Sequence, residues 1–314
     1  MRKVLYLSHA TPEVYAIIRE AVPAGYELVT LERDSDDERR VKVADCEVVI
    51  VAASGFRRAV IEHARSLKLV HHQGVGWQDT TDHALLKERG LPLALTPEGT
   101  TLGVAEHTVL LMLAVLKLLP HADAELRQGR FHINALRPVS RELHGMTVGY
   151  IGMGRIAQAV AERLRAFGTK GIYCDPIVPG FDGLEKKSFD EVLQLSDIVS
   201  LHLPLTAQTR NLVGAAQIAR MKPGAYLVNT ARGGLIDEAA LAKALESGRL
   251  AGAALDVFES EPVAAGHPLA RLRNVVLTPH ISAGTRDALQ TKMRALFANV
   301  ERYYRGEPLQ NRVF

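Results

Sequence analysis

Short apolar, β-prone runs alternate with amphipathic helical stretches along almost the whole chain. The strand candidates in the first hundred residues are Val4–Leu7, Val48–Ala52, Leu69–His71 and Leu93–Leu95. Helical patterns separate them, such as Pro12–Ala21 and Arg58–Arg65. Strands that alternate with helices in this way are typical of an α/β fold. The pattern therefore predicts a parallel sheet in this part of the chain.

A second series of the same kind begins near Thr147. Its strand candidates are Thr147–Ile151, Gly171–Cys174, Ile198–Leu201, Ala225–Asn229, Gly252–Leu255 and Val275–Leu277. Its helical patterns include Ile156–Phe167, Phe189–Leu195, Ala215–Met221 and Glu238–Ser247. These six strands predict a complete doubly wound unit over residues 99–284. A long helical pattern, Thr285–Tyr304, follows it and predicts a return to the first domain, which then comprises residues 1–98 and 285–314.

A glycine-rich turn joins the first strand of the second series to its helix. Gly152 and Gly154 follow the strand, and Ala157 completes a GxGxxA pattern. Gly152 permits a tight turn, Gly154 lets the backbone approach a pyrophosphate, and Ala157 keeps helix and strand close. The start of the helix offers free N–H groups and partial positive charge to phosphate groups. The segment therefore predicts a dinucleotide-binding site.

An acid ends the next predicted strand. Asp175 lies about 20 residues beyond the glycine turn, which is the spacing of the acid that holds the ribose 2′-OH of NAD. A carboxylate at this place repels a 2′-phosphate. The sequence therefore predicts NAD (NADH) as the cofactor and disfavours NADP.

Three further polar groups follow three successive strand candidates of the second series. They are Arg232, Glu261 and His280. Ligands of open α/β sheets bind at the carboxyl ends of the strands, and a guanidinium suits a carboxylate. We therefore expect a site that holds an anion, a proton donor and an acid that orients the donor. Glu259 is interpreted as a solvated loop acid.

Composition and charge exclude several classes of function. The 314 residues carry a net charge of +3 that is spread along the chain, with no basic stripe for nucleic acid. The two cysteines, Cys46 and Cys174, suit a reducing compartment. The first apolar run is too short for a signal peptide, and the apolar helix Thr108–Leu119 is too short to span a bilayer. We expect a cytoplasmic protein with no membrane partner.

Two pairs of neighbouring polar residues are not expected to take part in the chemistry directly. His71 and His72 alternate on a strand without a third ligand, so no metal site is expected. Glu106 and His107 are predicted to open the buried helix. Glu106 is a candidate to support the site from behind.

Taken in order, these motifs resemble those of the D-isomer-specific 2-hydroxyacid dehydrogenases, in particular those of the glyoxylate and hydroxypyruvate reductases. The segments that carry the resemblance are Leu67–Gly76 with Asp79, Thr101–His107, Gly149–Ile156, Ser196–Thr206, Met221–Asp237, Ala254–Pro262 and Pro279–His280. The resemblance implies two doubly wound parallel-sheet domains, with a Rossmann NAD-binding domain inserted into a flavodoxin-like substrate domain. It also implies an active site between the domains, a homodimer joined through the NAD-binding domain, and hydride transfer between NADH and a small 2-oxo acid that yields a D-2-hydroxy acid.

The resemblance assigns roles to individual residues. Arg232 matches the substrate-anchoring arginine, His280 the catalytic acid/base and Glu261 the carboxylate paired with it. Val75 and Gly76 match the backbone donors that hold the substrate carboxylate. The positions that match the cofactor-binding set are Val75, Gly152, Gly154, Arg155, Ile156, Asp175, Leu203, Pro204, Thr230, Ala231, Asp256, His280 and Ala283.

Departures from the family pattern concern the substrate. Members that take phosphoglycerate carry extra arginines where this chain has Ala53 and Gln73, which disfavours a phosphorylated substrate. Arg57 and Arg58 lie close in sequence and keep that possibility open. Trp77 stands where a smaller residue is common, either narrowing the substrate site or packing in the core.

Two other functions remain open at this point. One is a formate dehydrogenase-like enzyme, although such relatives pair the histidine with glutamine rather than with an acid such as Glu261. The other is an NAD-sensing binding protein of the corepressor type. Which 2-oxo acid is used does not follow from the sequence.

Overall fold

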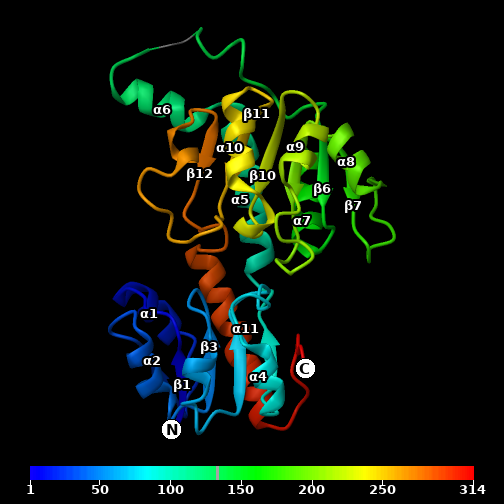
Figure 1. Cartoon of the computed structure of the whole chain (residues 1–314). Helices are drawn as coiled ribbons and strands as arrows, with labels where there is room; N and C mark the ends of the chain where they lie inside the picture. Colours follow the sequence, from blue (N-terminus) through cyan, green and yellow to red (C-terminus); the bar gives the residue numbers. More distant parts are fainter. Residues whose placement is uncertain (132–133) are drawn as a thin grey trace. The chain divides into compact units, whose positions relative to one another are not determined.

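Two compact units make up the chain in the computed structural model, which describes residues 1–131 and 134–314. The first unit contains Met1–Thr100 and Gly284–Phe314, and the second contains Thr101–Ala283 (Figure 1). The second unit is thus inserted in the sequence of the first. The predicted functional boundaries, 1–98 plus 285–314 for the substrate and 99–284 for NAD, stay a prediction.

The described residues of the first unit contain a five-stranded parallel sheet in the order β2-β1-β3-β4-β5. Its strands are β1 (Arg2–Tyr6), β2 (Tyr26–Val29), β3 (Val48–Val51), β4 (Leu69–His72) and β5 (Leu93–Leu95). This is the flavodoxin-like order, as predicted. The sequence pattern misses β2, because Glu27 interrupts a run of only four residues at the edge of the sheet.

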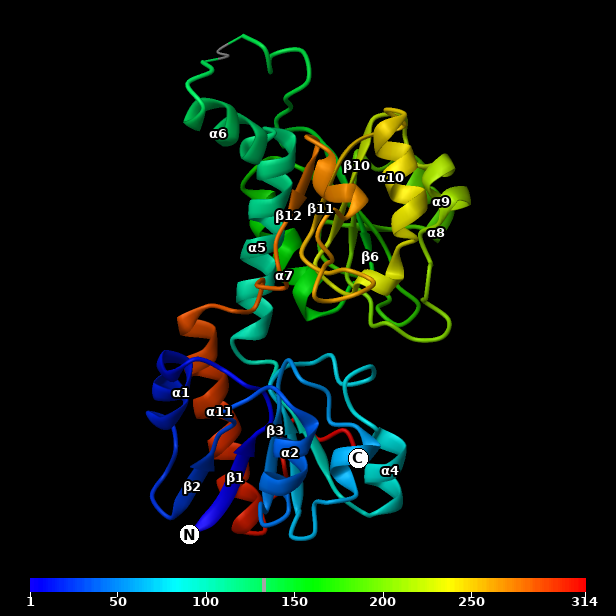
Figure 2. The same ribbon diagram turned by 60° about the vertical axis from the view of Figure 1, so that its left-hand side comes forward.

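Helices cover both faces of this sheet. They are α1 (Pro12–Arg19), α2 (Asp36–Val43), α3 (Arg58–Ile61), α4 (His83–Glu88) and α11 (Arg286–Tyr304). Alternate residues of β1 point to opposite faces. Val4 and Tyr6 pack with α1 and α11, and Leu5 packs with α2, α3 and α4. Figure 2 shows α1 and α11 on one side of the sheet and α2 and α4 on the other. The helix α3 is shorter than predicted, and α2, whose exposed face is strongly charged, is not predicted by the apolar pattern.

The second unit is a seven-stranded parallel sheet, counted over its described residues, in the order β12-β11-β10-β9-β6-β7-β8. The strands are β6 (Thr147–Ile151), β7 (Lys170–Cys174), β8 (Glu185–Lys186), β9 (Ile198–Leu201), β10 (Ala225–Asn229), β11 (Leu250–Leu255) and β12 (Val275–Leu277). This is the Rossmann order extended by one strand. The prediction of six strands is one short, because β8 consists of two exposed charged residues and carries no apolar signal.

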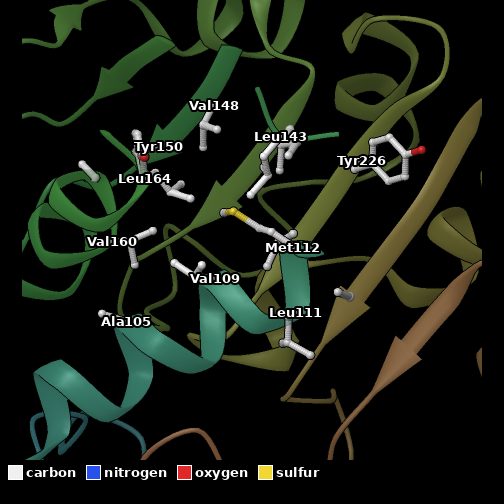
Figure 3. Packing of buried hydrophobic residues seen from close by; sticks show 14 of the residues in the cluster. Ala105, Val109, Leu111, Met112, Leu143, Val148, Tyr150, Val160, Leu164 and Tyr226 are labelled. Carbon is white, nitrogen blue, oxygen red and sulfur yellow. The ribbon is translucent and has the colours of Figure 1, made fainter. Parts of the chain in front are cut away.

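Helices also cover both faces of the second sheet. They are α5 (Thr100–Leu116), α7 (Arg155–Arg165), α8 (Phe189–Leu195), α9 (Ala215–Arg220) and α10 (Glu238–Glu246). The helix α6 (Leu119–Arg127) follows α5 and buries none of its residues. Figure 3 shows Val109 and Met112 of α5 in one core with Val148 of β6 and Val160 of α7. The helices α8, α9 and α10 pack on the opposite face.

The helix α5 begins at Thr100, earlier than predicted. Glu106 and His107 therefore lie inside the helix and do not open it. Among the described residues no single helix has the length and apolarity needed to cross a membrane, and α5 and α6, bent by 62° at their junction, reach that threshold only as a pair.

Parallel pairing places the carboxyl ends of β6, β9, β10, β11 and β12 at one edge of the sheet. The chain reverses its direction of strand addition between β6 and β9, which is where doubly wound sheets bind ligands. The residues predicted to act in chemistry follow these strands.

Candidate active site

A hydrogen-bonded histidine–glutamate pair stands at this edge of the second unit. His280 Nδ1 lies 2.7 Å from Glu261 Oε2, and the backbone N–H of Phe258 donates to Glu261 Oε1 at 2.9 Å. Burial raises the pKa of the Glu261 carboxyl, but hydrogen bonds from His280 and Phe258 and the charges of His280 and Arg232 outweigh it, so the pKa is lowered. Glu261 is therefore an anion that holds one ring nitrogen of His280. The side chain of His280 is 48% exposed, so the ring is accessible from outside.

The backbone of His280 is held in an unusual conformation. Its φ of 53° lies in the left-handed region, which is uncommon for residues other than glycine. The N–H of His280 donates to the carbonyl oxygen of Asp256 at 2.8 Å. The Asp256 carboxylate then accepts the N–H groups of Ile281 and Ser282, both at 2.9 Å. One buried acid thus fixes the loop on both sides of the histidine.

Asp256 is itself held by α5. Thr278 donates its hydroxyl to Asp256 Oδ1 at 2.6 Å, and His107 Nε2 lies 3.0 Å from the Thr278 hydroxyl and 3.5 Å from Asp256 Oδ1. The helix therefore supports the His280 loop through His107. Glu106, the candidate for that position, instead extends into solvent toward Arg163.

The buried carboxylate of Asp256 makes the stability of the second unit depend on pH. Burial raises its pKa, but hydrogen bonds from His107, Thr278, Ile281 and Ser282 lower it to about 2. A depressed carboxyl pKa stabilises the fold above the unfolded value of about 3.9, and that contribution is lost as the pH falls toward 2. We expect Asp256→Asn to lower the free energy of unfolding at pH 7 by about 2–3 kcal/mol.

Urea unfolding of the wild type and the variant at pH 7 and at about pH 2.5 measures this difference, which should shrink mainly as the pH approaches the folded-state pKa of about 2. Asp190→Asn is the matched control, because its ion pair with Arg220 is half exposed and should contribute less than about 1 kcal/mol. Equal losses for the two variants would show that Asp256 has no special role.

Arg232 is presented by a tightly fixed turn after β10. The side chain of Asn229 accepts the N–H of Ala231 at 3.0 Å and donates to the carbonyl oxygen of Arg232 at 2.9 Å. A Cβ atom on Gly233 would overlap the backbone of Phe258, so only glycine fits there. This close approach brings the Arg232 turn against the segment that carries Glu261.

The glycine turn after β6 has the geometry that a pyrophosphate needs. Gly152 has a φ of 90°, and a Cβ there would lie 2.5 Å from the carbonyl oxygen of His202, so glycine is required. Gly154 precedes α7, and a Cβ on it would enter open space. The first N–H groups of α7, from Arg155 and Ile156 onward, follow this turn, and the start of a helix is suited to binding an anion.

Asp175 stands beside the glycine turn. Its Oδ2 accepts the N–H of Met153 at 2.8 Å, and its Oδ1 accepts the N–H groups of Ile177 and Val178 at 2.7 and 2.8 Å. Burial raises the pKa of Asp175, but these bonds and the charge of Lys186 lower it. The carboxylate is thus ionised at neutral pH, next to the turn.

The other predicted cofactor positions lie along the same edge. Thr230 is buried, with its hydroxyl 2.9 Å from that of Thr108, and Ala231 is half-buried. Pro204 is exposed and accepts the Thr209 hydroxyl at 2.7 Å. Leu203 and Ala283 are half-buried in the segments after β9 and β12.

The first unit carries Val75 and Gly76 in the loop after β4. Val75 is 38% exposed, and Trp77 packs partly buried against the core of this unit. Trp77 is therefore a packing residue, its ring 5.1 Å from that of His83. Ala53, Arg57 and Arg58 are exposed.

The sequence analysis does not identify three residues that hold the site in place. They are Asn229, which fixes the Arg232 turn, and His107 with Thr278, which fix Asp256. Asn229 could have been identified from its position, because it is a polar residue at the end of a buried strand. His107 acts on a residue 149 positions away, so nothing local to it in the sequence indicates the partner.

Comparison with known proteins gives consistent findings. A family model described as the NAD-binding domain of D-isomer specific 2-hydroxyacid dehydrogenases matches residues 109–282. D-3-phosphoglycerate dehydrogenase of Methanocaldococcus jannaschii is 39% identical over 281 residues, which cover 88% of this chain and 53% of that protein. Hydroxypyruvate reductase of Thermotoga maritima is 40% identical over 264 residues, which cover 83% of this chain and 85% of that protein.

A solved structure shares the whole architecture. The NAD-dependent formate dehydrogenase of Staphylococcus aureus, in complex with NAD, has a TM-score of 0.85 and 31% identity, covering 99% of this chain and 98% of that one. This chain spans about half the length of the phosphoglycerate dehydrogenases that it matches. It spans most of the length of the hydroxypyruvate reductase.

Proposed function

Because this chain belongs to the D-isomer specific 2-hydroxyacid dehydrogenase family, we propose that it is an NAD-dependent oxidoreductase that interconverts a small 2-oxo acid and a D-2-hydroxy acid. The observation that carries the proposal is the 2.7 Å pair of His280 and Glu261, with Arg232 acting on the same carboxylate. An imidazole held by an acid beside a guanidinium is suited to reducing a carbonyl that neighbours a carboxylate.

The cofactor supplies the hydride when it is bound, and the chain's own residues bind the acid and move a proton. Arg232 binds the substrate carboxylate and polarises the carbonyl oxygen. The N–H groups of Val75 and Gly76 hold the second carboxylate oxygen. As the carbonyl carbon gains the hydride, the protonated His280 gives its Nε2 proton to the developing alkoxide, and the 2-hydroxy acid results.

Glu261 keeps His280 ready for this transfer. Because Glu261 accepts a hydrogen bond from Nδ1, the proton that is exchanged with substrate resides on Nε2. In the direction of oxidation the neutral Nε2 takes the proton of the hydroxyl group. General acid–base catalysis of this kind contributes about 10²–10⁴-fold in rate.

The fit of NAD rests on three features of the second unit. They are the glycine turn, the open space beside Gly154 and the ionised Asp175 next to both. We propose that Asp175 accepts the hydroxyl groups of the adenosine ribose and excludes a 2′-phosphate by charge repulsion. NAD is then preferred over NADP.

The preference for NADH should depend on the charge of Asp175. We expect Asp175→Asn to reduce the ratio of kcat/KM with NADH to that with NADPH by about tenfold, which is about 1.4 kcal/mol. Steady-state rates with both cofactors measure the ratio. Asp182→Asn is the control, because that exposed acid lies outside the glycine turn. An unchanged ratio for Asp175→Asn would argue against the assignment.

Initial rates with a panel of acids test the function itself. Glyoxylate, hydroxypyruvate, pyruvate and a phosphorylated 2-oxo acid are offered with NADH and with NADPH, and formate is offered with NAD. We expect turnover of the small unphosphorylated 2-oxo acids. Oxidation of formate would instead support the second candidate, which the likeness to a formate dehydrogenase favours. Binding of NADH without turnover of any acid would indicate a sensor.

We also propose a cytoplasmic homodimer joined through the second unit. Apolar side chains of α6 and the segment after it are exposed in the single chain, namely Leu119, Leu126, Phe131 and Val139. Exposed apolar patches of this kind mark protein interfaces. The free thiols of Cys46 and Cys174 support a reducing compartment.

A further inference from the structure

The loop that carries Val75 and Gly76 is tied together by a directional chain of hydrogen bonds. The N–H of Gly74 donates to Nδ1 of the buried His72 at 3.0 Å. Because Nδ1 accepts, the ring proton of neutral His72 resides on Nε2. His72 Nε2 lies 3.1 Å from the Thr80 hydroxyl oxygen and donates to it.

The contacts of the Thr80 hydroxyl independently indicate the same donor-to-acceptor direction. Its oxygen lies 3.1 Å from the carbonyl oxygen of Gly76 and 3.4 Å from that of Trp77. A hydroxyl has one proton, and these carbonyls can only accept, so the proton points to them. The chain therefore runs from His72 through Thr80 to Gly76, while the same ring accepts from Gly74.

The peptide units on both sides of the Val75–Gly76 peptide are each held by a hydrogen bond. The N–H of Thr96, beyond β5, donates to the carbonyl oxygen of Gly74 at 3.2 Å. Within a planar trans peptide the carbonyl and the N–H point in opposite directions, so the N–H of Val75 points away from Thr96. On the other side, Thr80 fixes the carbonyl of Gly76, which belongs to the peptide unit that follows the Gly76 N–H.

The far end of the loop is anchored in the core. The Trp77 ring lies between His83, with ring centres 5.1 Å apart, and Phe314 at the other end of the unit's sequence, at 6.5 Å. The N–H of Phe56 donates to the carbonyl oxygen of Thr80 at 2.8 Å. The position of the loop is set by packing. His72 and Thr80 hold the peptide units that come before and after the Val75 and Gly76 amides.

We propose that His72 and Thr80 are positioning residues: they hold the peptide units on either side of the Val75 and Gly76 amides, so that these amides face one oxygen of the substrate carboxylate. The proposal rests on the proposed function for the identity of the ligand. Donors that are oriented in advance bind an anion without reorganising. The substrate's carboxylate keeps the same charge throughout the reaction, so this contact contributes to binding more than to the chemical step.

Thr80→Val tests the chain of hydrogen bonds. It removes the hydroxyl and keeps the shape of the side chain. We expect KM for the best acid of the panel to rise about tenfold while kcat changes less than about threefold, since the contact is made in the ground state and in the transition state alike. The dissociation constant of NADH should not change.

The neighbouring Thr81→Val is a matched control. Within the described part of the chain, the buried Thr81 hydroxyl has no hydrogen-bond partner, so its loss should leave KM and kcat unchanged. His72→Gln keeps a donor near the position of Nε2 but loses the acceptor for Gly74. His72→Asn keeps an acceptor near Nδ1 but loses the donor to Thr80. Each should raise KM, and His72→Asn combined with Thr80→Val should raise it no further than either alone.

Hydrogen exchange of the peptide that covers residues 74–80 separates this proposal from the proposed function. We expect Thr80→Val to speed exchange there about tenfold and Thr81→Val to leave it unchanged. Equal exchange, or equal KM, in the two variants would overturn the role of Thr80. Failure of the wild type to reduce any acid would overturn the proposed function instead, and exchange would still decide whether the loop is held by His72 and Thr80.

Discussion

His280→Ala should lower kcat for reduction of the best 2-oxo acid by about 10²–10⁴-fold, because it removes the proton donor for the alkoxide. The dissociation constant of NADH should change little, since the glycine turn and Asp175 remain intact. Single-turnover rates and NADH fluorescence titration measure the two quantities separately. The expectation follows from the position of Nε2, which Glu261 leaves available by holding Nδ1.

A second histidine–glutamate pair of the same unit serves as the control. His267 Nε2 lies 3.0 Å from Glu238 Oε2. Neither residue has a proposed role in catalysis or in binding. His267→Gln keeps a donor toward Glu238 and should leave kcat within about twofold of the wild type. Full turnover in His280→Ala would remove the histidine from the mechanism, whatever the result for His267.

Arg232→Ala should raise KM for the acid and lower kcat together, so that kcat/KM falls about 10³-fold or more. In the proposed mechanism the guanidinium binds the carboxylate in the ground state and the carbonyl oxygen more strongly as charge develops. Two charge-assisted hydrogen bonds of about 1.5–3 kcal/mol each account for this size. Steady-state kinetics over a range of acid concentrations, at saturating NADH, give both constants.

Arg232→Lys distinguishes charge from shape. Lysine keeps the positive charge but lacks the planar fork that binds two oxygens, so it should recover only part of the loss. Arg220→Ala is the control for a lost surface charge, because that side chain pairs with the half-exposed Asp190. An effect of Arg232→Ala that is confined to the affinity for NADH would contradict the role in substrate binding.

Much of the fold near the site could be predicted because its signals are local. A buried strand that ends in glycine, an apolar helix face and an acid at fixed spacing are all contained within about 30 residues. The parallel order of β6, β7 and β9–β12 follows from this alternation. The edge strands β2 and β8 could not be predicted, because short and partly exposed strands carry little apolar pattern.

The supporting contacts of the site were less accessible to sequence reasoning. His107 contacts Thr278 across 171 positions of the chain, and this pairing depends on how α5 packs on the sheet. Glu106 and His107 are adjacent, yet their side chains point in different directions around the helix. Because α5 begins at Thr100, its rotation relative to the sheet could not be placed from a predicted start near residue 106.

The route of the chain between the units has a consequence for synthesis on the ribosome. One face of the first sheet, with Val4, Tyr6 and Leu69, is covered by Met293 and Phe297 of α11. That helix is translated only after the entire second unit. The unit begun first is therefore completed last, and this apolar face lacks its covering helix until α11 emerges. A circular permutant that places α11 ahead of β1 would remove this delay.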